Sequence, residues 1–434
     1  MHADHEVDTL SRMLDSKKQV TGPRVERYRG RNRLRYTADT VESADLATFR
    51  TNLYRVAVDS VAERMRLRGV HVTAAGTDVS KIAWNEWLAS DMDQHTPTLI
   101  REALAAGAGY CTIVTTPSGR TRVVVEDAES MVTQFDPITR DPVKSLRRWD
   151  DVHPDGTIRT EYATVYDSAE VRTYEKRGGW TLTERVPHTL GQCPVVTVTN
   201  RRALSGSYGY SVIDDMAPLV DGLSKVLSDM LVASEDVARP RRWASGIDLE
   251  EQDEDDGFVA DAGVGIDMDG HLSDDPDGNT PVESPFEHGN RMFTTESADA
   301  KFGQLPGADL AGYRTAAELL RQEIMTVASL PAHLVGVTTA NPASADATRA
   351  SELSLTAAAE SAMSVVGTSL ERAFRLLVSA RTGFRPEDVT VRLRWCRPDT
   401  RSEAQDVDGV TKLFSLGLLS VEEARARIRV DDYA

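Results

Sequence analysis

The sequence predicts an α+β protein of more than one domain, and three observations support this. Apolar residues recur at three- and four-residue steps over residues 212–238, which is the pattern of one long amphipathic helix. Between residues 110 and 200 the period falls to about two, in short β-branched and aromatic runs separated by Pro-Ser-Gly, Pro-Asp-Gly and Gly-Gly turns. At 434 residues the chain also exceeds the usual limit of a single core. We therefore expect two or three domains that combine long helices with an antiparallel β region.

The negative charge is concentrated in one segment. Residues 248–287 contain fifteen Asp and Glu and no Lys or Arg, so removing them from the net charge of −18 leaves −3 for the rest of the chain. This net negative charge disfavours a protein that binds nucleic acid by neutralising its phosphates. It would, however, allow nucleic acid to move past the protein without being bound. The sequence contains no apolar run of about 18 residues and no apolar N-terminal region, which argues against a membrane span and a secretory signal. We expect an intracellular product without a membrane partner.

The first 44 residues are interpreted as a polar N-terminal arm. A basic cluster in this segment alternates with Tyr28 and Tyr36, and two interpretations stay open. The arm either contacts a partner or nucleic acid, or is a solvated terminal segment, which is the favoured interpretation. The basic residues are Arg24, Arg27, Arg29, Arg31, Arg33 and Arg35.

The elements that follow are predicted from local periodicity and capping residues. Residues 45–68 carry an amphipathic stripe, and Gly69 stands where a glycine closes a helix. A short strand at residues 70–72 precedes helices over residues 80–91 and 96–106, with Ser80 as the expected N-cap and with Trp84 and Trp87 on the buried face.

The second half of the chain is predicted to be mainly helical. The helix over residues 212–238 ends at Arg239-Pro240, because proline lacks the N–H that would continue it. Further helices of roughly 30 Å and 55 Å are predicted over residues 310–328 and 344–381, the latter closed by Gly383. A segment broken by Pro331, Gly336 and Pro342 separates them. A strand at residues 389–395 and one or two small surface helices over residues 402–427 complete the prediction.

Motifs for catalysis are missing from the sequence. It contains no phosphate-binding loop, zincin, hydrolase-elbow or dinucleotide motif, and His333 is interpreted as a loop residue and not as a base. The best metal candidate, the loop that begins near Asp274, has Thr280 and Phe286 where an EF-hand needs Gly and Glu. We predict no catalytic residue, no metal and no cofactor. Cys111, Cys193 and Cys396 lack metal-ligand spacing and are expected to be buried free thiols.

Several blocks of the sequence resemble, in order, the portal proteins of tailed bacteriophages, particularly those of phages that infect actinobacteria. The central block starts at Gly209-Tyr-Ser211-Val-Ile-Asp, continues through the helix and ends with Pro240 and Arg242-Trp243-Ala-Ser-Gly246. The similarity spans about residues 20–425. The other blocks are Tyr54-Arg-Val-Ala-Val-Asp59-Ser-Val-Ala-Glu63-Arg64, residues 84–91, Pro194-Val-Val with Asn200-Arg201, Lys301-Phe-Gly-Gln-Leu-Pro306-Gly-Ala-Asp309-Leu, and Leu330-Pro-Ala-His-Leu334 with Asn341-Pro342.

The resemblance implies a structural role and not an enzymatic one. Portal proteins form a ring of twelve copies at one capsid vertex, through which double-stranded DNA enters and later leaves. The implied partners are other copies of the chain, the DNA, the large terminase subunit, the head-tail adaptor, and the major capsid and scaffolding proteins. The implied location is the capsid vertex of the virion, after assembly in the host cytoplasm.

The resemblance also implies a division of the chain into the parts of a portal fold. Two amphipathic helices that flank an inserted module would form a hairpin, and repeating it about an axis would line a tube with helix faces. The parts are an N-terminal arm (1–44), a wing of helices and antiparallel strands (45–211), a first stem helix (212–238), a small α/β clip with an acidic insertion (239–305), a second stem helix (306–329), a tunnel loop (330–343), a long wing helix with a wing strand (344–401) and a short helical crown (402–434).

Three groups of residues are the candidate sites. Uncharged tunnel-loop side chains, above all Thr338, Thr339 and Asn341, are expected to meet DNA. A basic and aromatic group after the first stem helix either contacts a partner or another copy, or caps the helix C-terminus, and both interpretations stay open. The groups are Pro331, His333, Val337, Thr338, Thr339 and Asn341 in the tunnel loop, Arg239, Arg241, Arg242 and Trp243 at the clip, and Asp221, Lys225, Asp229, Arg314, Glu318 and Arg321 on the stem, where Asp and Glu would repel the DNA backbone.

Two other classes of function stay open at this stage. A different minor capsid protein would share the helix and strand content but would differ in stoichiometry. A metal-dependent hydrolase that uses the Asp-rich segment is less favoured, because those carboxylates lie among Gly and Pro.

Overall fold

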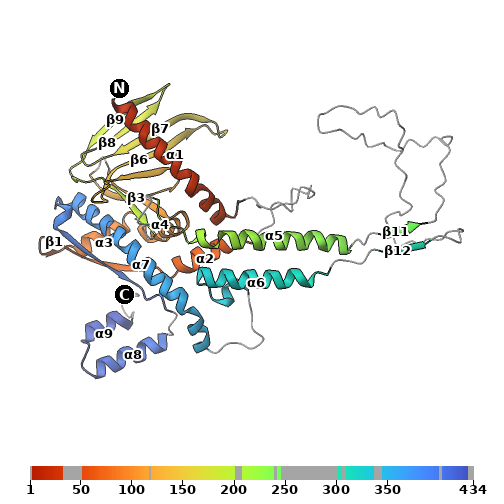
Figure 1. The fold of residues 1–434 in the computed structure, drawn as a ribbon. Coiled ribbons are helices and arrows are strands. Elements are labelled where there is room, and N and C mark those ends of the chain that lie inside the picture. Colours follow the sequence, from red (N-terminus) through yellow and green to blue (C-terminus); the bar gives the residue numbers. More distant parts are fainter. Residues whose placement is uncertain are drawn as a thin grey trace. The chain divides into compact units, whose positions relative to one another are not determined.

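The chain combines long helices with antiparallel sheets, which confirms the predicted α+β class (Figure 1). Its contacts divide it into two units, Met1–Met230 with Ala311–Ala434, and Leu231–Leu310. No helix among the described residues is long and apolar enough to cross a membrane. The computed structural model describes residues 2–32, 51–116, 119–200, 208–238, 242–245, 301–304, 309–336, 345–399 and 403–428.

The predicted β region forms two antiparallel sheets. The first has the order β10-β3-β4, so its last strand returns to pair with its first. The second is a meander in chain order from β5 to β9. The strands are β3 (Ala108–Thr115), β4 (Thr121–Glu126), β5 (Met131–Phe135), β6 (Pro142–Val152), β7 (Ile158–Tyr166), β8 (Glu170–Lys176), β9 (Trp180–Pro187) and β10 (Val195–Thr199).

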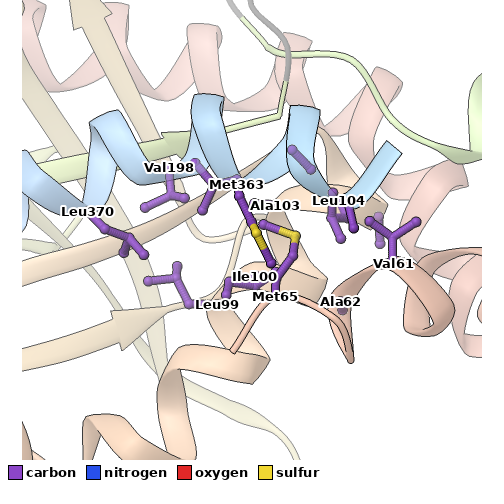
Figure 2. Packing of buried hydrophobic residues seen from close by; sticks show 14 of the residues in the cluster. Val61, Ala62, Met65, Leu99, Ile100, Ala103, Leu104, Val198, Met363 and Leu370 are labelled. Atoms are coloured by element: carbon purple, nitrogen blue, oxygen red, sulfur yellow. The ribbon is translucent and has the colours of Figure 1, made fainter. Parts of the chain in front are cut away.

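The largest core lies between the long helix α7 (Ala345–Thr382), the helices α2 (Leu53–Ala62) and α4 (Met92–Ala106), and the sheet β10-β3-β4. Figure 2 shows Met363 and Leu370 of α7 in one apolar cluster with Leu99 and Ile100 of α4. A stacked pair, Trp87 of α3 (Ser80–Leu88) and Phe374 of α7, joins another helix to this core, with ring centroids 4.3 Å apart. Gly383 closes α7 as predicted, with φ of +80°.

The first helix, α1 (His2–Arg29), corrects the prediction of a solvated N-terminal arm. Val7, Leu10 and Leu14 are buried against the meander sheet, so the segment is part of the core. Its polar residues are also partnered, since Glu6 pairs with Lys144 and Arg172. The prediction is wrong because the polar residues of α1 find their ion partners on strands more than a hundred positions away, which no local pattern reveals.

Lys17 of α1 is buried and makes specific contacts. Its Nζ donates hydrogen bonds to the carbonyl oxygens of Ala128 (2.5 Å) and Met131 (2.7 Å), and lies 4.1 Å from the centroid of the Tyr110 ring. Burial lowers the pKa of Lys17 from 10.5 to about 7, although the negative charge of Glu102 acts in the opposite direction and raises it. The ammonium group therefore anchors α1 to the turn between β4 and β5.

The depressed pKa of Lys17 predicts a pH dependence of stability. The unfolded chain keeps the Lys17 proton up to about pH 10.5, whereas the folded chain releases it near pH 7, so unfolding takes up a proton between these values. The free energy of unfolding then rises with pH across this interval, by at most about 1.4 kcal/mol per pH unit. Lys17→Met removes this contribution. Urea denaturation measures the free energy of unfolding, which should rise with pH more steeply for the natural chain than for Lys17→Met. The control Lys18→Met should show the same pH dependence as the natural chain. If the free energies of unfolding of the natural chain and of Lys17→Met differed by the same amount at every pH, the prediction would be contradicted.

A third sheet has the order β13-β1-β2, and three local predictions around it are wrong. The helix predicted over residues 45–68 lies partly outside the described residues, and its described part ends at Ala62, after which β1 (Leu67–Ala74) begins. Gly69 sits at a register irregularity inside β1 and does not close a helix. Ser80 is the first residue of α3 and not its N-cap, which is Val79. The other strands are β2 (Thr77–Asp78) and β13 (Val389–Trp395).

The C-terminal part contains two short helices, as predicted. They are α8 (Glu403–Ser415) and α9 (Val421–Ile428), which contact each other. Val410 and Ala424 are their buried apolar residues, whereas Phe414 and Leu418 are exposed. A small helical element at this position fits the predicted crown, which remains a prediction.

Candidate functional site on the paired helices

The two helices predicted to form a stem pack against each other and against the main core. They are α5 (Ile213–Ala238) and α6 (Ala311–Ala328). Met216, Val220 and Leu223 of α5 share one core cluster with Ile324 of α6. Gly222 of α5 faces α6, since a Cβ added there would lie 4.0 Å from Leu320 Cδ1. The pairing thus rests on the apolar stripes that the sequence pattern predicted.

The beginning of α5 is held by the last turns of α1. Arg24 forms a two-pronged ion pair with Asp214, with its Nε 2.8 Å and its Nη2 2.6 Å from the two carboxylate oxygens. The same guanidinium donates to the carbonyl oxygen of Ala106 at the end of α4 (2.9 Å). Two-pronged pairs of this kind fix orientation as well as proximity. The arginine cluster at the end of α1 is therefore a junction between three helices.

Asp221 is the most deeply buried of the candidate stem residues. Its carboxylate accepts a hydrogen bond from the Tyr54 hydroxyl (2.8 Å) and one from Arg27 Nη2 (3.2 Å). Only 7% of its side chain is exposed. Burial, and next the hydrogen bond to Asp221, raise the pKa of Tyr54. Asp221 therefore does not present its charge to solvent as the predicted DNA-repelling stem residues would, because Arg27 and Tyr54 bind its carboxylate inside the fold.

Four of the other stem candidates are paired with each other within their own helix. Lys225 donates to Asp229 one turn later (2.5 Å), and Arg314 pairs with Glu318 (2.9 Å) with 82% and 54% of their side chains exposed. Arg321 is half-buried. Pairs of this kind at exposed positions contribute only a few tenths of a kcal/mol. Their effect is to reduce the net charge on the polar faces of α5 and α6.

The start of the predicted tunnel loop is a short 3-10 helix, η2 (Ala332–Val335), which follows buried Pro331. His333 is half exposed, and its Nε2 lies 3.5 Å from Glu352 Oε1 of α7. The Glu352 carboxylate also lies 3.4 Å from Arg64 Nη2. These contacts attach the base of the loop to α7 and, through Glu352, to the turn that follows α2. Val337, Thr338, Thr339 and Asn341 lie outside the described residues.

The predicted clip is described only by one pair of strands. β11 (Arg242–Ser245) and β12 (Lys301–Gln304) are antiparallel, with Arg242 opposite Gln304 and Trp243 opposite Gly303. This pairing brings together two segments that flank the acidic stretch in the sequence. Arg239, Arg241 and residues 248–287 lie outside the described residues, so their predicted roles stay predictions.

Among the described residues, one Ser-His-Asp grouping resembles a catalytic triad, but its hydrogen bonds connect the wrong side chains. Ser80 Oγ lies 3.4 Å from His71 Nδ1, but it donates its hydrogen bond to Asp78 Oδ1 (2.5 Å), and Asp78 also accepts from the Ser80 backbone N–H. Asp78 thereby fixes the first turn of α3 and does not orient the histidine as a base. Within the described ranges no group of three or more His, Cys, Asp or Glu side chains is arranged to hold a metal ion.

The three cysteines are free thiols, and two are buried as predicted. Cys111 and Cys193 are buried, whereas Cys396 is half-buried. Burial raises the pKa of the Cys111 thiol to about 12 and raises that of Cys193 as well. Because the thiolate is the reactive form, these two side chains are inert packing residues.

Sequence reasoning missed the part of α1 in this site, although a signal was present. Val7, Leu10, Leu14, Thr21 and Val25 follow the three- and four-residue steps of an amphipathic helix and are all buried. The buried Lys17 falls on the same stripe, and this charge in the stripe concealed the pattern.

Comparison with known proteins matches almost the whole chain to one family. Residues 23–433 match the family described as phage portal protein, SPP1 Gp6-like. The portal protein of Mycobacterium phage D29 is 27% identical over 386 residues, which are 86% of this chain and 74% of that protein. The portal protein of Mycobacterium phage L5 is 27% identical over 387 residues, with the same two shares.

Comparison with solved structures matches the chain to proteins of gene transfer agent particles. A chain from the neck of an empty particle, computed with C6 symmetry, has a TM-score of 0.48 at 15% identity, over 92% of this chain and 95% of that one. A chain from the virion of a native particle has a TM-score of 0.44 at 13% identity, over 87% of this chain and 89% of that one.

The family match confirms the resemblance that the sequence blocks indicated. It covers the helices α2 to α9, the three sheets and both strands of the predicted clip. The chain belongs to the phage portal protein family of the SPP1 Gp6-like type.

Proposed function

We propose that the chain assembles into a ring at one vertex of a capsid and that duplex DNA enters and leaves through the central channel of this ring. The observation that carries this proposal is the match to the portal family over residues 23–433. The role is structural and not enzymatic, and its place is the virion, after assembly in the host cytoplasm. A ring arises when one surface patch of each copy binds a different patch of the next and the rotation closes.

In this ring α5 and α6 are the stem helices, and residues 239–305 form the clip. Two features support the assignment. The helices pack side by side through their apolar stripes, which leaves their polar faces available to border a channel. The charges of Lys225, Asp229, Arg314 and Glu318 are paired within each helix, so these faces attract DNA phosphates only weakly. A duplex then slides past them with little resistance.

The tunnel loop, residues 330–343, provides the contact with DNA. Thr338, Thr339 and Asn341 have uncharged side chains that can touch the duplex without holding its phosphates. The contacts of His333 with Glu352, and of Glu352 with Arg64, attach the base of this loop to α7 and to the turn after α2. A firm base limits how far the loop departs from the stem while DNA moves.

The partners follow from the same assignment. The large terminase subunit docks during packaging and the head-tail adaptor docks afterwards, with Arg239, Arg241, Arg242 and Trp243 at the clip as the contact residues. The major capsid and scaffolding proteins surround the ring. The test is charge reversal at Arg239, Arg241 and Arg242. If ring formation and motor docking stayed intact in this variant, these residues would only cap the C-terminus of the helix.

The mass of the purified assembly tests the proposal. One chain has a mass of 47.6 kDa, and a closed ring of portal type should contain about a dozen copies. Mass photometry of the full chain should therefore show a particle of about twelve times the single-chain mass. A monomer or dimer over the whole concentration range would contradict the proposal and favour a different minor capsid protein.

A further inference from the structure

A cavity of about 430 Å³ lies between α7 and the meander sheet. Its walls come from α7, the start of β6, the turn after β7, the chain before β10, and the 3-10 helix η3 (Pro386–Asp388). This volume falls within the range of small-ligand sites. The apolar side chains that line it are Pro142, Val143, Leu376 and Pro386, and its two cations are Arg372 and Arg375 of α7. The cavity thus combines apolar walls with a pair of arginines.

Arg372 is largely buried in this cavity and is held in one orientation. Only 23% of its side chain is exposed. Its Nη2 donates a hydrogen bond to Gln192 Oε1 (3.1 Å), and its Nη1 lies 3.5 Å from Asp141 Oδ1. A guanidinium fixed in this way is preorganised to receive a ligand, because its side-chain entropy is already lost.

The positive charge of Arg372 is compensated only in part. Burial lowers its pKa, and the negative charge of Asp141 raises it by less. The Asp141 side chain is 69% exposed, so water screens its effect. The charge of Arg375 also lowers the pKa of Arg372, because the two guanidinium groups repel each other. A further anion between them would therefore be favourable.

The second carboxylate of the lining, Glu387, does not supply this anion. It is exposed, and within the described ranges it forms no ion pair with Arg372 or Arg375. Arg375 Nε donates to the carbonyl oxygen of Glu371 in its own helix (3.4 Å). Its Nη groups have no hydrogen bond or ion pair in the described part of the chain, so they are available to a ligand.

The two carboxylates of the lining restrict the charge of the ligand. Asp141 and Glu387 repel a doubly charged phosphate more strongly than a singly charged carboxylate. A carboxylate can also accept two parallel hydrogen bonds from one guanidinium. The apolar side chains of the lining would cover a short hydrocarbon chain beside it. The lining thus fits a carboxylate on a short apolar stem.

We propose that this cavity binds a carboxylate carried on a short apolar chain, with Arg372 and Arg375 as its cationic partners. The carboxylate belongs either to a free organic acid or to an acidic side chain of another protein, and the same contacts serve both. The proposal does not depend on ring formation, because every wall of the cavity comes from one chain.

Saturation-transfer NMR of the full chain with pentanoate tests the proposal. We expect a dissociation constant on the order of 1 mM. Pentanamide, which has the same shape without the charge, and inorganic phosphate should each bind at least about tenfold more weakly.

A capped peptide separates the two sources of the carboxylate. The probe is Ala-Glu-Ala with an acetylated N-terminus and an amidated C-terminus, so that the glutamate carries its only charge. If pentanoate binds and this peptide binds more tightly, the cavity receives an acidic side chain of another protein. If pentanoate binds and the peptide binds more weakly, the cavity receives a free organic acid.

Single substitutions locate the site. Arg372→Gln should weaken pentanoate binding at least about tenfold. The matched control is Arg381→Gln, which removes the same charge from the same helix at a position with 53% of the side chain exposed. This control should leave the affinity unchanged. Glu387→Gln removes a like charge from the cavity and should strengthen binding about threefold, a gain that a loss of folding cannot produce.

Three results would overturn the proposal. One is binding of pentanamide or phosphate as tight as that of pentanoate, because the cavity would then not select a carboxylate. Another is equal weakening by Arg372→Gln and Arg381→Gln while circular dichroism shows both variants folded. The third is a Glu387→Gln variant that binds pentanoate no more tightly than the natural chain, and this result decides the matter even if Arg372→Gln fails to fold.

Discussion

Asp221→Ala is expected to destabilise the folded chain by about 3 kcal/mol or more. The carboxylate accepts hydrogen bonds from Tyr54 and Arg27, and only 16% of the Arg27 side chain is exposed. Removing one member of a buried pair leaves the other charge without compensation, which costs about 3 to 5 kcal/mol. The Tyr54 hydroxyl loses an acceptor as well, although it keeps the Ala217 carbonyl at 3.1 Å. Urea denaturation of the purified chain measures the change.

Two variants of α5 separate this effect from a general loss of charge. Asp229→Ala removes a carboxylate from the same helix, but its pair with Lys225 is partly exposed, so it should cost at most about 0.5 kcal/mol. Asp221→Asn keeps an acceptor for Tyr54 and should fall between the two alanine variants. If Asp221→Ala and Asp229→Ala were equally mild, the junction between α1, α2 and α5 would not depend on Asp221.

Gly209→Ala is expected to destabilise the chain by about 2 to 5 kcal/mol. Gly209 has φ of +68°, and a Cβ there would lie 2.0 Å from the carbonyl oxygen of Gly107, a backbone atom that already accepts from Asn200 N–H. A left-handed backbone costs a residue with a Cβ about 1–2 kcal/mol, and forced overpacking adds about 1–3 kcal/mol. The close approach brings the chain just before α5 against the end of α4. A large fall in the thermal midpoint should follow.

Gly178→Ala is the matched control for this prediction. Gly178 has a similar φ of +77°, but no atom lies within 4 Å of an added Cβ. It should therefore show the backbone cost alone, about 1–2 kcal/mol. Equal effects at Gly178 and Gly209 would mean that the contact with Gly107 relaxes without cost.

The long helices could be predicted from the sequence because their signals are local. The helices α5, α6 and α7 begin and end within one or two residues of the predicted limits. The stripes of α5 and α6, the breaks near Pro331 and Pro342, and the glycine at position 383 all act within one or two turns. The strand β13 was also predictable, since its buried and exposed residues alternate. Periodicity and capping decide such elements before any tertiary contact forms.

The errors arise where distant segments meet. The segment of α1 is polar by composition, yet Glu6, Lys17 and Arg24 find partners on strands and helices far along the chain. The helix predicted up to position 68 stops at Ala62, because the following residues pair with β13 more than 300 positions later. The division of the β region into two sheets depends on β10 returning to β3, which the turn residues do not encode. Contacts of this kind override local preference.

In the candidate site too, contacts within one helix could be predicted from the sequence, whereas contacts between distant segments could not. The pairs Lys225–Asp229 and Arg314–Glu318 are one helical turn apart and could be predicted from spacing. The burial of Asp221 could not, since its partners come from α1 and α2. The contact of His333 with Glu352 joins η2 to α7 and has no local signal. The roles of Thr338, Thr339 and Asn341 stay predictions from the family resemblance.

Imaging the assembled particle by electron cryo-microscopy tests the proposed channel most directly. The expected result is a closed ring in which the α5–α6 pair of every copy borders a central bore wide enough for duplex DNA. A particle without a bore, or a ring in which these two helices face away from the axis, would contradict the assignment of α5 and α6 as the stem.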